Sequence, residues 1–109
     1  YFDTGQTRKA VSAYERSLTL APDNADVLTD LGTMYRELGD YERAITSFRR
    51  ASTVNPSHEN ALFNEGVVLY FDLHRKDEAQ KAWQRLLRLN PDARAPDGRS
   101  VADILGTLR

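Results

Sequence analysis

The chain contains no cysteine, so neither a disulfide framework nor a thiolate zinc site can form in it. Its 15 basic side chains nearly balance its 16 acidic ones, which gives a formal net charge of −1. Such a balance provides no long-range field that favours nucleic acid or an anionic membrane. No apolar run approaches the length of a membrane span, and the N-terminus has no signal-peptide pattern. What is left is a chain of 109 residues with room for one modest core or a short run of stacked repeats.

Residues that could support catalysis or metal binding are also scarce. The two histidines, His58 and His74, fall in predicted turns and lack the spacing of helical metal ligands, so we interpret both as solvated surface side chains. No glycine-rich phosphate loop and no serine elbow motif is present. Asp23, Asp26 and Asp30 cluster at a predicted helix start, where the helix dipole favours carboxylates without any bound cation. The sequence therefore predicts a non-catalytic protein that uses no cofactor and no metal.

Small and aromatic residues recur along the chain with a period of 34 residues. The residues Tyr1, Gly5, Ala10, Tyr14 and Pro22 return as Tyr35, Gly39, Ala44, Phe48 and Pro56, and Leu28 and Gly32 return as Leu62 and Gly66. A third occurrence follows 35 residues later, as Ala79, Trp83, Asn90 and Pro91. A fixed period of this length is typical of a helical array in which each unit buries its neighbour's face.

The best-defined unit, residues 25–58, has the spacing of two helices joined by a tight turn. Its first apolar stripe advances in steps of three and four residues, through Leu28, Leu31, Tyr35 and Leu38. Gly39 then ends this helix, and Asp40 is placed to cap the next one. The second helix ends before Pro56, which disfavours helix at the preceding residue.

On these positions the chain resembles a tetratricopeptide repeat. The resemblance is carried by Gly32, Tyr35, Gly39, Ala44, Phe48, Ala51 and Pro56, by the turn at residues 37–41, and by residues 77–79 of the third unit. It implies an all-α fold, an antiparallel helix-pair solenoid of about two and a half repeats. It divides the chain into a partial repeat at 1–24, a complete repeat at 25–58, a repeat with one inserted residue at 59–93, and a linker with a capping helix at 94–109.

The third unit departs from the pattern at three places. One residue is inserted between Leu69 and Ala79, and His74 stands where a glycine stood before, so we expect a wound-out turn there, preceded by an irregular helical turn. Glu65 replaces Leu31, and we expect this carboxylate to be partly exposed or paired with arginine, since burial without a partner is costly. Leu86 replaces a small residue and so must meet a different neighbour.

The two ends of the array are expected to differ. Ser100 and Asp103 mark the start of a short helix carrying Val101, Ile104, Leu105 and Leu108, which we expect to cover the apolar face of the third repeat. The helix at about residues 7–20 lacks most of its partner, which leaves Ala10, Tyr14 and Leu18 partly uncovered. Because the chain begins in mid-pattern at Tyr1, we expect further sequence upstream; otherwise a partner protein or a second copy would cover this face.

The resemblance also implies a ligand site, because the first helix of each pair in such arrays lines a concave groove that receives an extended peptide or a helix. The matching positions here are Asp26, Thr29, Asp30, Thr33, Arg36, Asn60, Phe63, Asn64, Val67, Tyr70 and Phe71. Phe63 and Tyr70 are the expected apolar anchors, and the aspartates set the charge preference. The alternative is that Phe63, Tyr70 and Phe71 are partly covered by the C-terminal segment.

One function of the family fits this chain poorly. Chaperone-binding members grip a C-terminal carboxylate with Lys, Asn and Arg, whereas the matching places here hold Thr29, Thr33, Asn60 and Asn64, of which only Asn64 agrees. Asp26 and Asp30 would repel a terminal carboxylate. We therefore expect a ligand with a basic residue beside an apolar anchor.

The predicted function is a non-catalytic protein–protein interaction scaffold or adaptor whose partner is a peptide or helix of another protein. One alternative is self-association through the incomplete N-terminal repeat, and another is an accessory role in a larger catalytic or membrane-anchored protein. RNA binding is less favoured, because Glu42 and Glu78 interleave with the arginines of the second helices. No direct membrane contact is expected from this segment.

Overall fold

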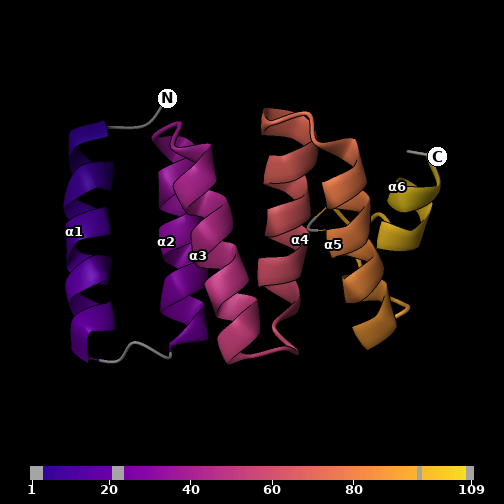
Figure 1. Cartoon of the computed structure of the whole chain (residues 1–109), viewed down its shortest axis with the longest axis horizontal. Coiled ribbons are helices and arrows are strands. Elements are labelled where there is room, and N and C mark those ends of the chain that lie inside the picture. Colours follow the sequence, from indigo (N-terminus) through magenta and orange to yellow (C-terminus); the bar gives the residue numbers. More distant parts are fainter. Residues whose placement is uncertain (1–3, 21–23, 96, 108–109) are drawn as a thin grey trace.

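The computed structural model describes residues 4–20, 24–95 and 97–107, and these residues are mainly helical (Figure 1). The elements in chain order are α1 (Thr4–Leu20), α2 (Ala25–Glu37), α3 (Tyr41–Val54), α4 (Glu59–Val67), the π-helical turn η1 (Val68–Asp72), α5 (Lys76–Leu89) and α6 (Val101–Thr107). Within the described ranges, the extended pairing is limited to an isolated antiparallel bridge between Arg94 and Ser100. The predicted all-α fold class is confirmed.

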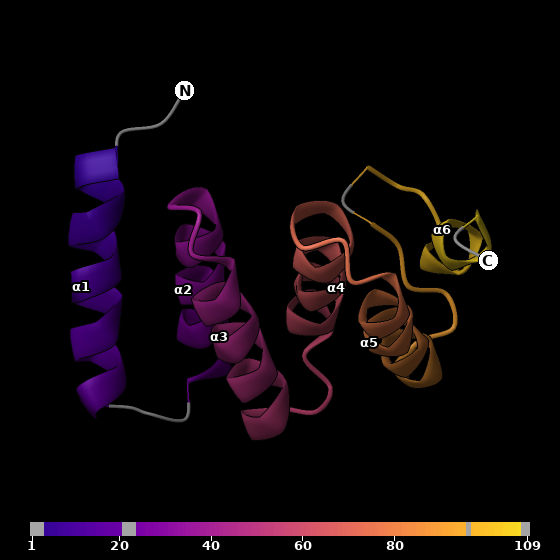
Figure 2. The same cartoon turned by 45° about the horizontal axis from the view of Figure 1, so that its top comes forward.

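The helices follow one another in chain order from α1 to α5, with the short α6 at the far end (Figures 1 and 2). The most extensive packing joins α2 to α3 and α4 to α5, which makes two antiparallel pairs. The two pairs contact each other where α3 packs on α4. The remaining long helix, α1, packs on α2 of the first pair. This is the packing order of a helix-pair solenoid.

The predicted turn between the two helices of the first pair is present. Gly39 has a φ of 80°, a left-handed conformation that favours glycine. The side chain of Asp40 then accepts a hydrogen bond from the backbone N–H of Arg43 at 3.3 Å and so caps α3. Asn24 caps α2 in the same way, accepting from the N–H of Val27 at 3.1 Å.

Glycine allows each helix pair to pack closely around one aromatic ring. A Cβ atom added at Gly32 of α2 would lie 2.6 Å from the Cε1 of Phe48 on α3. At the equivalent position of the next pair, a Cβ atom at Gly66 would overlap the indole of Trp83. Both rings are fully buried, so the recurring glycine and aromatic pattern is the packing contact of each pair.

The inserted residue of the third unit is absorbed at the end of α4. The helix widens into η1, where Leu73 donates its N–H to the carbonyl of Val68 at 3.0 Å, five residues earlier. His74 follows with a φ of 57°, in the place where the period has glycine. The expected irregular turn and wound-out connection are therefore confirmed.

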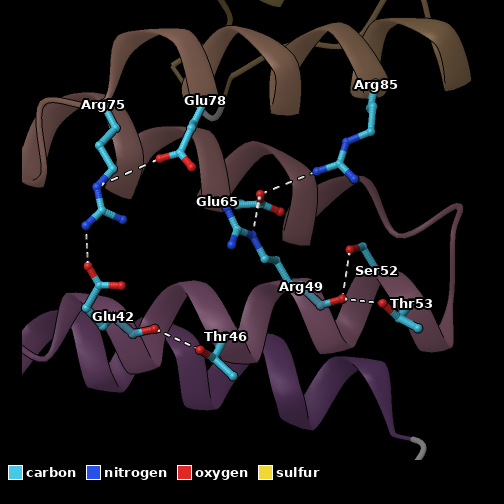
Figure 3. Close-up of polar contacts among 9 residues, drawn as sticks. All are labelled: Glu42, Thr46, Arg49, Ser52, Thr53, Glu65, Arg75, Glu78 and Arg85. Atoms are coloured by element: carbon cyan, nitrogen blue, oxygen red, sulfur yellow. Dashed lines mark hydrogen bonds and ion pairs between the residues drawn. The ribbon is translucent and has the colours of Figure 1, made fainter.

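The two helix pairs are also joined by ion pairs on the side of α3 and α5 (Figure 3). Arg75 Nη2 lies 2.6 Å from Glu42 Oε1, which links the N-terminal ends of α5 and α3. Farther along, the side chain of Glu65 is only 2% exposed and pairs with Arg49 and Arg85. The prediction that Glu65 is paired with arginine is confirmed.

At the C-terminal end, α6 covers the third unit as expected. Val101 and Leu105 are buried in one cluster with Trp83 and Leu86, so Leu86 does meet a new neighbour. Ile104 packs at the edge of this cluster, while Leu108 lies outside the described residues.

At the N-terminal end, α1 starts at Thr4, three residues before the expected start near residue 7. Gly5 consequently lies inside α1 and does not form a turn like that of Gly39. Ala10 and Tyr14 are half-buried as expected, whereas Leu18 is buried against α2 residues such as Leu28. The predicted end of a preceding helix would fall on residues 1–3, outside the described residues.

Candidate functional site

The first helices of the two pairs, α2 and α4, lie next to each other and are joined near both ends. Near their N-termini, Nε2 of His58 lies 2.8 Å from Oδ1 of Asp26. At the other end, Arg36 in the last turn of α2 makes a two-point contact with Asp72 of η1, at 2.6 Å and 3.4 Å. These contacts fix the spacing of α2 against α4 and η1. We call the surface that the three elements present the α2/α4 face.

Four of the five predicted residues of α2 are exposed on this surface: Asp26, Asp30, Thr33 and Arg36. Thr29 differs, because it is only 7% exposed and its hydroxyl donates to the carbonyl of Ala25 at 2.8 Å. Ala25, Thr29 and Gly32 stand at i, i+4 and i+7, on one side of the helix, and all three are buried. Thr29 is therefore part of the packing of α2 and is not presented to a ligand.

The charge of the α2/α4 face is acidic on α2. Arg36 is paired with Asp72, so these two charges offset each other. Asp26 contacts His58 but its side chain is 89% exposed, and Asp30 forms no ion pair with any described residue. Asp23, the third member of the predicted acidic cluster, lies outside the described residues. Asp26 and Asp30 are thus the carboxylates that a ligand on this part of the face would meet.

The aromatic residues of α4 and η1 are less open than the sequence suggested. The ring of Phe63 stacks on Trp83 with centroids 6.2 Å apart, and Tyr70 lies against the same indole at 6.1 Å. Phe63, Val67 and Tyr70 are half-buried against the cluster that contains Val101 of α6. The cover shown for Phe63 and Tyr70 is therefore the indole of Trp83 on α5, in a cluster that also contains Val101, and cover by the C-terminal segment itself stays a prediction.

Phe71 is the aromatic side chain that remains open. It is 54% exposed and meets the edge of the Tyr70 ring, with centroids 4.8 Å apart. It lies in η1, the π-helical turn that follows α4.

A cavity of about 470 Å³ opens beside the first two turns of α4. Its lining includes three predicted site residues, and the full set is Glu59, Asn60, Phe63, Asn64, Leu86, Ala93 and Arg94. Asn60 is exposed and Asn64 is half-buried. Ala93 and Arg94 could not be predicted as lining residues, because they follow Pro91, where the repeat pattern no longer predicts the path of the chain.

His58 has a structural role that the sequence did not predict. It is the N-cap of α4: its Nδ1 accepts from the N–H of Ala61 at 3.3 Å, while Nε2 faces Asp26. This pattern assigns the proton to Nε2, which donates to the carboxylate. The side chain is only 11% exposed, so the interpretation of His58 as a solvated surface residue is wrong. His74 is exposed as expected.

The described part of the chain contains no group of three or more His, Asp or Glu side chains arranged to hold a metal ion. No helix in these ranges combines the length and the apolar character needed to cross a membrane.

A separate cleft runs between α1 and α3, on the other side of α2. It consists of two adjoining cavities of about 350 Å³ and 600 Å³, which share Glu15, Tyr35 and Arg43 in their walls. Burial raises the pKa of Tyr35 above its usual value, and the neighbouring Glu15 carboxylate raises it further, whereas the guanidinium of Arg43 acts in the opposite direction. We call this the α1/α3 cleft.

Proteins of different kinds have sequences similar to this chain. The chain is 26% identical to the photosystem I assembly protein Ycf3 of Acaryochloris marina over 104 aligned positions, which cover 81% of this chain and 63% of the relative. It is 29% identical to anaphase-promoting complex subunit 3 of Schizosaccharomyces pombe over 108 positions, which cover 99% of this chain and 15% of the relative. The chain thus spans less than two thirds of the length of either relative.

Among solved structures, the fold is similar to that of the first TPR domain of Spaghetti (RPAP3), which was solved with a bound HSP90 peptide, SRMEEVD. The TM-score is 0.79 and the sequence identity is 23%, over 95% of this chain and 78% of that one. At this identity the likeness shows the shared fold.

The strongest assignment comes from a family model, which matches residues 3–104 and is described as the middle TPR-like domain of cilia and flagella-associated protein 70. The match covers both helix pairs, η1 and most of α6. This match agrees with the order of the helices and with the packing of a glycine against an aromatic ring in each helix pair. The chain is a tetratricopeptide repeat protein and belongs to the family of the middle TPR-like domain of cilia and flagella-associated protein 70.

Proposed function

We propose that this chain is a non-catalytic protein–protein interaction module that binds an extended peptide or a helix of a partner protein on its α2/α4 face. The observation that carries the proposal is the cavity beside α4, which brings Asn60, Phe63 and Asn64 together. Amide side chains can both donate to and accept from a peptide backbone, and an aromatic wall accommodates an apolar side chain. The two contacts that join α2 to α4 and η1 hold this surface in one geometry before a ligand arrives.

The charges on α2 support a ligand with a basic residue. Asp30 is exposed without an ion-pair partner among the described residues, and Asp26 is largely open to solvent. A Lys or Arg of the ligand would pair with these carboxylates, while an acidic ligand would be repelled. The RPAP3 domain of similar fold is bound to the peptide SRMEEVD, which is rich in acidic residues. Because the α2/α4 face of this chain exposes Asp26 and Asp30, we propose a different ligand class for it.

The apolar part of the ligand would contact Phe63 in the cavity and Phe71 on η1. The structure leaves Phe63 half-buried and Phe71 exposed, so Phe71 offers more surface to a ligand than Tyr70, whose ring is turned toward Trp83 and Phe71. Exposed apolar side chains next to polar groups, such as Phe71 on this face, are characteristic of interaction sites.

The proposal is tested by selecting peptides from a random 12-residue phage library on the immobilised chain. We expect the selected peptides to combine a Lys or Arg with a large apolar residue. Asp30→Lys should weaken the binding of a selected synthetic peptide by about tenfold, since it replaces an attraction with a repulsion. The matched control is Asp77→Lys, which makes the same charge change at an exposed position in the first turn of α5.

Three results would contradict the proposal. They are a failure to select any peptide, selection of acidic peptides, or equal weakening by Asp30→Lys and Asp77→Lys. Circular dichroism at 222 nm must show that both variants keep the helix content of the parent chain, so that a loss of binding reports the surface and not the fold.

Self-association through α1 is the second candidate. Ala10 and Tyr14 on this helix are half-buried, and Leu20 at its end is 89% exposed. Sedimentation equilibrium separates the two candidates. A monomer at every concentration that still binds the selected peptide would remove self-association, whereas a concentration-dependent dimer that Tyr14→Arg abolishes would support it.

A further inference from the structure

A further pocket, distinct from the cavity beside α4 and from the α1/α3 cleft, lies between the C-terminal parts of α3 and α5. Its volume is about 350 Å³, and it is lined by Ser52, Thr53, Pro56, Leu62, Arg85, Arg88 and Leu89. None of these residues belongs to the α2/α4 face. We call it the α3/α5 pocket. Figure 3 shows part of its wall, with Arg85 on α5 and with Ser52 and Thr53 on α3.

The charge of the α3/α5 pocket is positive. Its lining contains two arginines and no carboxylate. Glu65, which lies behind Arg85, is shared between Arg85 and Arg49, at 3.4 Å and 3.2 Å, so one negative charge faces two positive ones. Arg88 is exposed and forms no ion pair with any described residue. Arg88 is therefore a positive charge in the pocket without an ion-pair partner among the described residues, and Arg85 shares its one carboxylate with Arg49.

The guanidinium groups are the donors that this pocket offers from its side chains. Ser52 and Thr53 use their hydroxyl hydrogens internally, since both donate to the carbonyl of Arg49, at 3.0 Å and 2.8 Å. Arg85 is half exposed although it contacts Glu65, so its free N–H groups remain within reach of a ligand. The planar guanidinium of an arginine can bind a carboxylate through two parallel hydrogen bonds.

The pocket also has an apolar edge. Leu89 is 46% exposed, Pro56 is exposed, and Leu62 lies buried at the base. Exposed aliphatic residues also end the other second helices, as Leu20 and Val54, and single ones are ordinary on a protein surface. Leu89 differs because it borders a cavity with two arginines in its wall.

We propose that the α3/α5 pocket binds an acidic segment of a partner protein, with one aliphatic side chain placed against Leu89 and Pro56 and flanking carboxylates paired with Arg85 and Arg88. Charge complementarity identifies the occupant: the lining has cations and apolar atoms and no anion. This site is separate from the α2/α4 face and has the opposite charge preference. The chain can therefore hold a basic and an acidic segment at the same time.

The test uses a fluorescein-labelled peptide, Gly-Asp-Glu-Asp-Leu-Glu-Asp-Glu-Gly, and fluorescence anisotropy with the full chain at 50 mM and 150 mM salt. Arg88→Glu should weaken binding by about tenfold, because it turns an attraction into a repulsion. Leu89→Ser and a peptide with Ala in place of Leu should each weaken it several-fold. Arg88 makes no ion pair in the described structure, so its replacement should leave the fold intact.

The matched control is Arg50→Glu, the same charge change on α3. Arg50 lines the α1/α3 cleft instead, so binding should change by less than about twofold. No binding by the parent chain would overturn the proposal. Equal weakening by Arg50→Glu would also overturn it, since it would reveal attraction to net charge alone. Tighter binding of a single-stranded oligonucleotide with the same dependence on Arg88 would assign the pocket to phosphate instead.

Discussion

Glu65 of α4 lies between Arg49 of α3 and Arg85 of α5, with its Oε2 3.2 Å from the Nε of the first and 3.4 Å from the Nη2 of the second (Figure 3). Its side chain is 2% exposed, whereas each arginine side chain is 51% exposed. A single buried carboxylate thus connects three helices of the two pairs, and the arginines extend from it to the surface. Its second oxygen, Oε1, has no hydrogen-bond partner among the described residues.

The first prediction concerns this cluster. Replacing both Arg49 and Arg85 with Met should lower the free energy of unfolding by about 3 kcal/mol, because it leaves a buried carboxylate without a cation. Replacing Glu65 with Leu, the residue of the preceding repeat, should change it by less than about 1 kcal/mol, because the remaining arginines are half exposed and can be hydrated. Urea unfolding followed by circular dichroism measures both values. A larger loss for Glu65→Leu than for the double arginine variant would contradict this account.

The arrangement of Glu65 between two arginines should also form one repeat earlier if the equivalent residues are substituted. Glu15, Leu31 and Arg50, which line the α1/α3 cleft, precede Arg49, Glu65 and Arg85 by 34, 34 and 35 residues. Leu31→Glu alone should destabilise the chain, because it buries a carboxylate next to Glu15. Adding Glu15→Arg should recover about 1–3 kcal/mol of this loss, because it recreates the arrangement around Glu65. A double-mutant cycle measured by urea unfolding gives the coupling. A coupling free energy of zero would show that the two junctions are not geometrically equivalent.

The third prediction concerns the close contact inside the first pair. In Gly32→Ala, the new methyl group would have three ring atoms of Phe48 within 2.9 Å, and such overpacking costs about 1–3 kcal/mol. The gain in helix propensity offsets about 1 kcal/mol of it, so the melting temperature should fall or stay level. Gly106→Ala in α6 is the control, since its methyl group would meet nothing within 4 Å and should be neutral or stabilising. The interpretation of the contact is wrong if Gly32→Ala stabilises the chain as much as Gly106→Ala does.

The fourth prediction concerns pH. Because burial and then Glu15 raise the pKa of Tyr35 above 10.0, the folded state favours the neutral phenol. This contribution to the stability of the folded state is fully present below the pKa of tyrosine in the unfolded chain, near 10. It is lost as the pH rises through the higher pKa of Tyr35 in the folded chain. Absorbance at 295 nm, taken as the difference between the chain and Tyr35→Phe, isolates this titration. Glu15→Gln should lower its midpoint, and a midpoint at or below 10.0 in the parent chain would contradict the prediction.

The sequence predicted the parts of the fold that depend on periodic packing. The 34-residue recurrence located α2 to α5, since Gly32 with Phe48 and Gly66 with Trp83 are local consequences of two helices in contact. One inserted residue was sufficient to locate η1, because a helix of fixed pitch must widen or break to accommodate it.

The candidate site was harder to predict, because its exposure depends on segments outside the period. After Pro91 the repeat pattern ends, so the coverage of Phe63 and Tyr70 by the cluster around Val101 could not be read from spacing. The resemblance to the repeat family placed Thr29 in the groove, yet α2 packs closely enough there to bury it. His58 caps α4 and contacts Asp26, which is 32 residues away, and the local pattern around a histidine carries no signal for such a contact.

The central proposal is that the α2/α4 face binds a peptide, and amide chemical-shift mapping tests it most directly. A peptide selected on the full chain would be titrated into the ¹⁵N-labelled protein. If the peptide binds on the α2/α4 face, the largest shifts are expected at Asp30, Thr33, Asn60, Asn64 and Phe71, with small shifts on α5 at Arg85 and Arg88. Largest shifts on α3 and α5, or along α1, with those five amides unmoved, would contradict it.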